Sequence, residues 1–376
     1  MITRIIKKNI EKDIDSGKII VRIGARQVGK TTLFEQISMG NDQVLQLNCD
    51  NYDDRLDLEQ KTSTQLRQLI NGYKMVVIDE AQRVKNIGLT LKMIADLKLP
   101  TQVLVTGSSS LDLASEINEA ATGRLWEYNF YPLSTKELVN ATSIREEKRL
   151  LEHRLIYGTY PEVVTHPADA RRILTNLTNN YLYKDVLEYK GIKKPDLLQR
   201  LVRALALQVG SEVSYNELAN MLGVNKETIE NYIDLLEKCY VVFRLPSYSR
   251  NLRSEIKKGK KIYFYDNGIR NALINNFATL ELRNDVEAIW ENYLISERLK
   301  MHRYNSSYTE MYFWRSTTQQ EVDLVEVVDG NISAFEIKWR KPKAKLPSSF
   351  VEAYPNATLQ IINTDNYINF LTSSQQ

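Results

Sequence analysis

The chain has 376 residues, of which 43% are hydrophobic and 26% charged, and its formal net charge is +3. This length predicts two or three domains, and this composition is typical of soluble globular proteins. A charge so close to zero restricts any nucleic-acid-binding surface to local basic patches. No apolar run approaches the ~20 residues of a membrane span, and the first residues indicate a charged amphipathic helix rather than an apolar signal segment. Two distant cysteines argue against a disulfide framework and a zinc site, so we expect a cytoplasmic protein without a membrane partner.

The first chemical motif follows an N-terminal helix expected over residues 1–16. β-Branched residues predict a buried strand over 19–23, and residues 24–31 then read G-x-x-x-x-G-K-T before a helical pattern. Strand, glycine-rich loop and helix in this order predict a phosphate-binding loop for a nucleoside triphosphate. Lys30 would reach the β- and γ-phosphates, and Thr31 would hold Mg²⁺. The predicted nucleotide-binding residues of this loop are Gly24, Ala25, Arg26, Gln27, Val28, Gly29, Lys30, Thr31 and Thr32.

A second motif supplies carboxylates. Residues 74–78 predict an apolar strand that ends in Asp79 and Glu80. Asp79 would complete the Mg²⁺ shell, and Glu80 would orient and polarise the attacking water in phosphoryl transfer. The alternative is a strand followed by an acidic helix cap. Together with the loop, the pair predicts binding and hydrolysis of a nucleoside triphosphate.

Further strands are expected over residues 44–50 and 101–110, the latter ending in hydroxyls, and their alternation with helices predicts a parallel sheet with ligands at its carboxyl edge. Thr106 or Ser108 would then sense the γ-phosphate, unless the serines only cap the next helix. Arg124 follows this region. It is either a solvated surface charge, a cis sensor, or a catalytic finger that reaches a neighbouring copy's γ-phosphate.

The middle of the chain is helical. Residues 145–190 predict a helical lid rich in tyrosine, and residues 196–246 have the helix-turn-helix spacing of a winged-helix fold. Ser214 and Asn225 are the expected caps of its two central helices. The second of these helices offers Lys226 among acidic residues, so this module either binds DNA or docks a partner or another copy. A basic block over residues 250–261 is either a solvated loop or a phosphate contact.

Near the C-terminus a helix with Glu291 precedes two strands joined by a turn at residues 329–331. Residues two apart in a strand point the same way, so Asp323, Glu336 and Lys338 are expected on one face of this hairpin. Asp323 and Glu336 would bind Mg²⁺, Glu291 would complete the shell, and Lys338 would activate water for phosphodiester cleavage. The alternative is an inherited fold that binds without cutting.

The succession G-A-R-Q-V-G-K-T-T, V-V-I-D-E-A-Q, V-T-G-S-S-S, T-G-R, Y-P-L-S and G-T-Y-P resembles a prokaryotic AAA-type ATPase family. Members carry a C-terminal domain of unknown function related to the PD-(D/E)xK nuclease fold. The resemblance implies an α/β protein with a P-loop AAA-type parallel sheet. It places the ATPase domain at residues 1–140, the lid at 141–195, the winged helix at 196–250 and the nuclease-like α/β domain at 251–376.

Three functions fit this organisation. The first is an ATPase that uses ATP and Mg²⁺ to bind or remodel DNA as a homo-oligomer and carries a metal-dependent nuclease domain. The second is an ATP-gated oligomerising or docking protein whose nuclease-like domain is inactive. A third is a toxin-like or mobile-element nuclease with a regulatory ATPase.

Overall fold

The chain separates into two compact units in the computed structural model. The first comprises Met1–Pro132 with Lys238–Tyr240, and the second comprises Leu133–Glu237 with Val241–Gln376. The first boundary was expected after residue 140, and the three later predicted domains fall within the second unit except for residues 238–240 of the predicted winged helix. The structure describes residues 2–107, 123–182, 195–249, 259–340 and 347–373.

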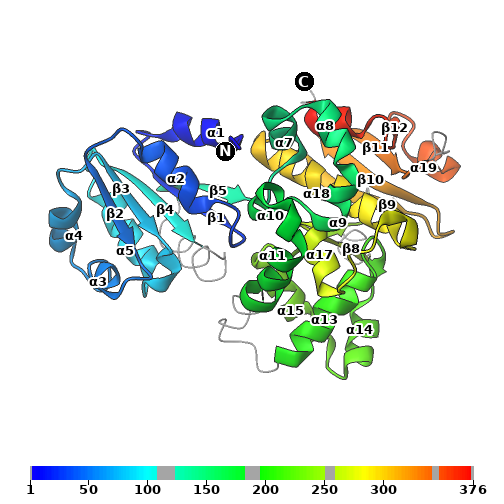
Figure 1. Ribbon diagram of the computed structural model, residues 1–376, viewed down its shortest axis with the longest axis horizontal. Helices are drawn as coiled ribbons and strands as arrows, with labels where there is room; N and C mark the ends of the chain where they lie inside the picture. Colours follow the sequence, from blue (N-terminus) through cyan, green and yellow to red (C-terminus); the bar gives the residue numbers. More distant parts are fainter. Residues whose placement is uncertain (1, 108–122, 183–194, 250–258, 341–346, 374–376) are drawn as a thin grey trace. The chain divides into compact units, whose positions relative to one another are not determined.

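A parallel sheet forms the centre of the first unit (Figure 1). Its strands are β1 (Ile19–Gly24), β2 (Val44–Asn48), β3 (Met75–Asp79), β4 (Gln102–Gly107) and β5 (Leu125–Phe130). They lie in the order β2-β3-β4-β1-β5, and all neighbours are parallel. Every residue of β1 and β4 is buried, as expected for central strands covered on both faces. Because β4 lies between β1 and β3, the carboxyl ends of these three strands meet at one edge.

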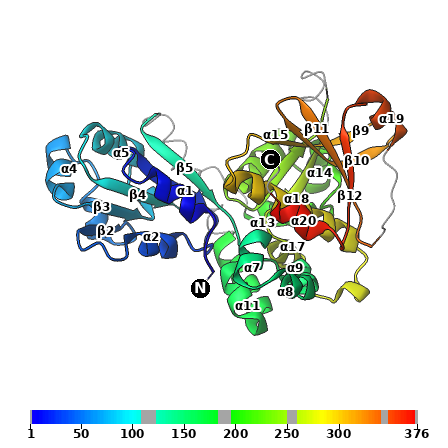
Figure 2. The same cartoon turned by 90° about the horizontal axis from the view of Figure 1, so that it is seen from above.

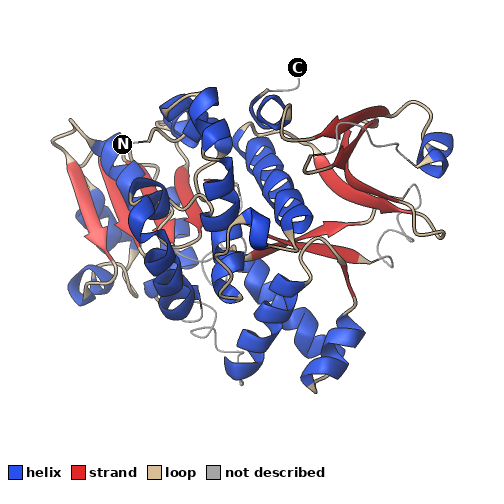
Figure 3. Ribbon diagram, turned by 45° about the vertical axis from the view of Figure 1, so that its right-hand side comes forward, coloured by secondary structure: helices blue, strands red, loops and turns tan. Residues whose placement is uncertain are grey.

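Helices flank this sheet (Figure 3). They are α1 (Ile6–Asp13), α2 (Lys30–Ser38), α3 (Tyr52–Leu56), α4 (Ser63–Ile70), the 3₁₀ turn η1 (Ala81–Arg83) and α5 (Ile87–Asp96). Aliphatic side chains of the sheet, such as Val76 and Val105, pack in one core with Leu66 of α4 and Leu91 of α5. This packing confirms the predicted α/β fold of the first unit.

The second unit begins with short helices, most of which lie in the segment predicted as the lid. They are α7 (Thr135–Ala141), α8 (Ile144–Arg149), α9 (Leu151–Tyr157), α10 (Pro161–Thr165), η2 (Pro167–Asp169), α11 (Ala170–Asn176) and the π-helical turn η3 (Leu177–Leu182). Ser134 and Glu137 form a capping box at the start of α7, which explains the serine of Y-P-L-S.

A three-stranded antiparallel sheet and three helices follow. The helices are α13 (Pro195–Leu207), α14 (Tyr215–Leu222) and α15 (Lys226–Lys238), and the strands are β6 (Glu212–Val213), β7 (Val242–Pro246) and β8 (Lys260–Phe264). Ser214 and Asn225 accept hydrogen bonds from backbone N–H groups of α14 and α15, so both predicted caps are confirmed. The sheet order is β6-β8-β7. β8 therefore belongs to the same sheet as β6 and β7. The expected domain boundary after residue 250, which would place β8 in the next domain, is wrong for this strand.

A mixed four-stranded sheet completes the second unit. Its strands are β9 (Glu310–Arg315), β10 (Glu321–Val328), β11 (Asn331–Ile337) and β12 (Thr358–Ile362), in the order β12-β11-β10-β9. β9, β10 and β11 are antiparallel, and β12 is parallel to β11. Helices α18 (Val286–Tyr304) and α20 (Tyr367–Thr372) lie side by side against this sheet (Figure 2). The remaining helices are α17 (Asn267–Leu273), η4 (Leu280–Leu282) and α19 (Ser348–Ala353).

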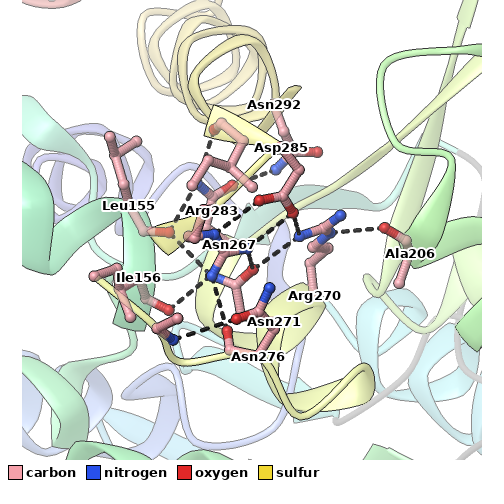
Figure 4. A network of polar contacts seen from close by, with 12 residues as sticks. Leu155, Ile156, Ala206, Asn267, Arg270, Asn271, Asn276, Arg283, Asp285 and Asn292 are labelled. Atoms are coloured by element: carbon pink, nitrogen blue, oxygen red, sulfur yellow. Dashed lines mark hydrogen bonds and ion pairs between the residues drawn. The ribbon is translucent and has the colours of Figure 1, made fainter. Parts of the chain in front are cut away.

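Helix α17 closes the end of α9 through polar side chains (Figure 4). The Asn271 amide donates to the carbonyl oxygens of Leu155 and Ile156 at 3.0 and 2.8 Å, and Asn267 donates to Leu155 at 3.3 Å. The last carbonyl groups of a helix have no partner within it, so these amides satisfy groups that burial would otherwise leave unpaired. On the same helix, Arg270 donates to the carbonyl oxygen of Ala206 at 2.7 Å.

The two sequence motifs Y-P-L-S and G-T-Y-P meet at this junction. Leu133 N–H donates to the carbonyl oxygen of Thr159 at 3.0 Å, and Thr159 N–H donates to the buried Asp266 carboxylate at 2.7 Å. Gly158 has φ +69° and ψ −157°, a conformation open in practice only to glycine. A Cβ atom there would lie 2.1 Å from Asp266 Oδ1. The glycine of G-T-Y-P is therefore required by backbone conformation and by space.

No helix in the described part of the chain is long and apolar enough to cross a membrane.

The contrast between two glycines tests this junction. Gly223, the C-cap of α14, has the same φ of +69° but no atom within 4 Å of its added Cβ. We expect Gly223→Ala to lower the free energy of unfolding of the second unit by about 1 kcal/mol through backbone strain alone. Gly158→Ala should lower it by roughly 3 kcal/mol or more, because a buried clash adds to the strain.

Urea unfolding followed by tryptophan fluorescence measures this difference, since Trp290, Trp314 and Trp339 all lie in the second unit. Equal effects of the two substitutions would contradict a rigid contact between Gly158 and Asp266.

Candidate nucleotide site and carboxylate cluster

The phosphate-binding loop connects β1 to α2, as predicted. Gln27 and Gly29 adopt positive φ values of 57° and 87°, which turn the loop back toward the start of the helix. Gly24 has no room for a side chain, because a Cβ atom would lie 2.2 Å from the carbonyl oxygen of Phe130. The loop thus uses its glycines where conformation or space requires them. Between these glycines Ala25 and Val28 are buried, whereas Thr32 on α2 is exposed.

Lys30 is folded onto its own loop. Its Nζ donates to the carbonyl oxygens of Gly24 and Ala25 at 2.8 and 2.7 Å, and the side chain is buried. These carbonyls provide the partial negative charge that a buried ammonium needs. Phosphate oxygens are stronger acceptors for a lysine, so this ammonium is positioned to exchange carbonyls for phosphates at the same loop.

The Mg²⁺ ligands predicted from the two motifs lie together. Thr31 Oγ1 donates to Asp79 Oδ2 at 3.0 Å, although the two residues are far apart in the sequence. A hydroxyl and a carboxylate at the carboxyl edge of a parallel sheet are oxygen ligands of the kind that Mg²⁺ prefers. These residues therefore fit a nucleotide-bound Mg²⁺ ion.

Thr106 lies at the end of β4, between the loop and Asp79. Its hydroxyl contacts Asp79 Oδ1, and it accepts a hydrogen bond from Glu80 N–H at 3.3 Å. Thr106, one of the two predicted γ-phosphate sensors, therefore contacts both Asp79 and the backbone of Glu80. Ser108, the other predicted sensor, lies outside the described residues.

Glu80 begins a sharp turn with φ 51°, directly after Asp79. Its carboxylate accepts a hydrogen bond from Gln82 Nε2 at 2.5 Å. This contact holds the glutamate beside the metal-binding edge, as required of a group that positions water. Gln82 was not predicted to take part in the site, although an amide two residues after a candidate base could have indicated it.

Two buried arginines, Arg4 and Arg22, contact the loop and were not predicted from the sequence. Arg4 donates to the carbonyl oxygens of Val28 at 2.8 Å and Tyr131 at 2.7 Å. Arg22 lies in β1, and both guanidinium centres lie 4.2 Å from the centroid of the Phe130 ring. This stack fastens the loop to the end of β5. The signal in the sequence was an arginine inside an otherwise apolar strand, I-I-V-R-I.

Arg124 lies at the opposite edge of the sheet. The register pairs Ile19 with Leu125 and Gly24 with Phe130, so Arg124 precedes the amino end of β5. Five strand steps from Ile19 to Gly24 span about 16 Å, more than an arginine side chain can reach. Its Nε pairs with Asp96 at 2.7 Å. A cis-sensor role is incompatible with this position, and a contact with a neighbouring copy's nucleotide stays a prediction.

The C-terminal hairpin places its three predicted residues on one face. Lys338 Nζ lies 2.7 Å from Glu336 Oε1 and 3.4 Å from Asp323 Oδ2. Burial and the nearby Asp323 carboxylate raise the pKa of Glu336. Although burial opposes it, the charges of Asp323 and Glu336 raise the pKa of Lys338. The predicted convergence of Asp323, Glu336 and Lys338 is therefore observed.

Glu291 on α18 has other partners. Its Oε1 lies 3.0 Å from Lys261 Nζ and accepts a hydrogen bond from Tyr263 at 2.5 Å. Lys261 also pairs with Glu321 at 2.5 Å. Burial, together with the charge of Asp323, raises the pKa of Glu291 to about 7, while Lys261 acts in the opposite direction.

The predicted metal shell of Glu291, Asp323 and Glu336 is not assembled. Within the described ranges, no three His, Cys, Asp or Glu side chains are grouped so that they could hold a metal ion. Lysine ammonium groups lie between the carboxylates instead. We call Glu291, Glu321, Asp323 and Glu336 the carboxylate cluster.

Three known families match successive parts of the chain. An AAA domain matches residues 16–139, a domain of unknown function (DUF8612) matches 148–280, and a second one (DUF4143) matches 286–373. An uncharacterized protein of Haemophilus influenzae is 26% identical over 286 residues, which cover 70% of each chain. An uncharacterized protein of Mycobacterium tuberculosis is 25% identical over 335 residues, which cover 88% of this chain and 72% of that protein.

A solved structure is also similar. The Walker-type ATPase of Pyrococcus abyssi matches with a TM-score of 0.51 at 14% identity, over 73% of this chain and 96% of that one. Together with the AAA match, this similarity supports the AAA-type P-loop ATPase fold.

The position of Arg124 generates a prediction for nucleotide affinity. Arg124→Ala should leave the affinity for ATP unchanged in dilute protein, because Arg124 does not reach the loop of its own sheet. Lys30→Ala should weaken it by at least about tenfold, since a charge-assisted contact with phosphate is lost. Titration with a fluorescent ATP analogue measures both, and a loss of affinity in dilute Arg124→Ala protein would contradict the strand register.

Proposed function

We infer, from a first unit with the AAA-type P-loop fold, that the protein hydrolyses ATP with Mg²⁺. The contact between Thr31 and Asp79 carries this inference, because it joins the two halves of a Mg²⁺ shell beside the phosphate-binding loop. Mg²⁺ supplies charge neutralisation of the phosphates when ATP is bound. All other contributions come from side chains and backbone groups of the chain.

The roles of these residues follow from their positions. Lys30 leaves the carbonyls of Gly24 and Ala25 and contacts the β- and γ-phosphates. Backbone N–H groups of the loop and the start of α2 surround the same phosphates. Glu80 orients and polarises the attacking water, while Thr106 and Gln82 hold Glu80 and its backbone in place. Ser108 stays a proposed γ-phosphate contact.

We propose that ATP turnover is coupled to DNA. The order of α13, β6, α14, α15, β7 and β8 supports a winged-helix module, which is a known DNA-reading arrangement. On α15, Lys226 is exposed, whereas Asp234 is engaged by Arg244. Lys226 is thus an exposed cation that could contact a DNA phosphate, next to the exposed carboxylate of Glu227.

Assembly of several copies is part of this proposal. Arg124 lies at the edge away from its own loop, so its catalytic role requires a neighbouring copy. We also propose a cytoplasmic location, with which the buried Cys49 and Cys239, not joined in a disulfide, are consistent.

A second candidate function is an ATP-gated oligomerising or docking protein with an inactive C-terminal domain. The helix with Glu291 and the hairpin with Asp323, Glu336 and Lys338 support a nuclease-like fold. The pairing of the carboxylate cluster with lysines favours loss of the nuclease chemistry.

The proposed base has a sharp test. Glu80→Gln should lower the rate of ATP hydrolysis by roughly 10²–10⁴-fold, because the amide cannot polarise water, and should keep ATP affinity. Glu35→Gln is the matched control, since Glu35 is exposed on α2 after the loop and should keep the normal rate. Phosphate release and nucleotide titration give the two readouts. A normal rate in Glu80→Gln would refute this role for Glu80.

Coupling to DNA is tested by steady-state ATP hydrolysis with single- and double-stranded DNA over a range of protein concentrations. We expect DNA to raise the turnover and Lys226→Glu to reduce this stimulation. Turnover that increases with protein concentration but does not respond to DNA would favour the self-assembling switch instead.

A further inference from the structure

Lys261 is the most enclosed cation beside the carboxylate cluster. It lies on β8 and is 1% exposed. Its Nζ bridges Glu291 Oε1 at 3.0 Å and Glu321 Oε1 at 2.5 Å, and the ring of Phe313 lies 5.6 Å away. A single ammonium group therefore joins a carboxylate of α18 to a carboxylate of β10.

The other carboxylates of the cluster also face cations, although the buried Glu336 Oε2 has no hydrogen-bond partner. Lys338 bridges Asp323 and Glu336, as described above. Arg315 lies 3.3 Å from the second oxygen of Glu321 and also pairs with Glu212 at 2.9 Å. Each of the four cluster carboxylates thus faces at least one cation of the chain itself. A divalent cation would meet this positive charge in addition to the carboxylates.

The backbone lies against two carboxylates near Lys261. A Cβ atom added at Gly210 would be in van der Waals contact with Glu291 Oε2 at 3.4 Å, and one added at Gly259 would lie 1.5 Å from Glu212 Oε1. Mg²⁺ binds at about 2.0–2.1 Å and usually retains several waters, so it needs room beyond its carboxylate ligands. The backbone at Gly210 occupies part of the space beside Glu291.

We propose that Lys261 takes the place of a metal ion, so that the carboxylate cluster binds neither Mg²⁺ nor Mn²⁺ and the C-terminal domain does not cut nucleic acid. The ammonium neutralises the carboxylates and connects the three-stranded sheet, α18 and the mixed sheet through buried ion pairs. This role is independent of the ATPase proposal, since no residue of the phosphate-binding loop takes part.

The origin of Lys261 strengthens this assignment. Glu291, Asp323, Glu336 and Lys338 belong to α18 and the hairpin, whereas Lys261 enters from β8, which pairs with β6 and β7. Tyr263, two positions along on the same face of β8, donates to the same Glu291 oxygen. β8 therefore supplies two donors to the oxygen that would have completed the metal shell.

The test measures Mn²⁺ binding to the full-length, nucleotide-free protein by the electron paramagnetic resonance signal of free Mn²⁺. The wild-type protein and Asp323→Asn should bind equally, because the cluster contributes no site. Lys261→Met removes the ammonium with little change in side-chain length, and it should gain a Mn²⁺ site at least tenfold tighter than any wild-type binding. The double variant Lys261→Met, Glu291→Gln should lose this gain.

Lys260→Met is the matched control. Lys260 is the preceding residue of β8, so its side chain points to the other face of the strand. Its substitution should leave Mn²⁺ binding at the wild-type level. Thermal unfolding gives a second readout, in which millimolar Mn²⁺ should raise the melting temperature of Lys261→Met and leave that of the wild type unchanged.

Three outcomes would overturn the proposal. They are wild-type Mn²⁺ binding that Asp323→Asn abolishes, metal-dependent plasmid cleavage that requires Asp323, and a folded Lys261→Met that gains no Mn²⁺ affinity. If Lys261→Met does not fold, the comparison of wild type with Asp323→Asn still decides the question. ATP hydrolysis by the same preparations is measured separately, so a failed ATPase proposal is not confused with a failed metal proposal.

Discussion

A charged side chain that is removed from water needs a partner, and this constraint organises the second unit around helix α18. Glu297 pairs with Lys300 at 2.5 Å, and Arg298 makes a two-point contact with Glu326 on β10. Lys300 also donates to the carbonyl oxygen of Leu133 at 3.4 Å. The contacts of Arg298 and Lys300 connect α18 to β10 and to the segment before α7, because a helix that is buried on most sides must satisfy its charges in several directions. The same constraint explains why the carboxylate cluster is filled with ammonium groups.

The nucleotide site depends on a different constraint, namely the parallel sheet. Three adjacent strands end at one edge, and the last residues of β1, β4 and β3 bring the loop, Thr106 and Asp79 together. The buried arginines Arg4 and Arg22 then fasten the loop to Phe130 at the end of β5. Because Arg4 also holds the carbonyl oxygen of Tyr131, the position of the loop and the position of the strand end are linked by one guanidinium group. The position of the loop thus depends on the packing of Arg4 and Arg22 against Phe130 as well as on the residues that would contact ATP.

The two candidate sites differ in how charge is arranged. At the phosphate-binding loop, Lys30 donates to carbonyl oxygens, and the Thr31 hydroxyl contacts the Asp79 carboxylate at the carboxyl edge of the sheet. These groups can change partners when a nucleotide arrives. In the carboxylate cluster the cations are paired with carboxyl groups, and Lys261 is enclosed. An ion pair of this kind is stabilising only while both partners stay in place, so the cluster is better suited to holding elements together than to exchanging ligands.

Local patterns in the sequence determined the phosphate-binding loop, Asp79 and Glu80, the helix caps at Ser214 and Asn225, and the hairpin that carries Asp323. These features depend on spacing between residues that are close in the chain, where strand and helix periodicity settles which side chains face together. Only the tertiary structure decided where Arg124 lies, which sheet receives β8, and that Lys261 enters the cluster. Those outcomes depend on strand register and on pairing between segments far apart in the sequence, and no local pattern encodes which distant cation will neutralise a buried carboxylate.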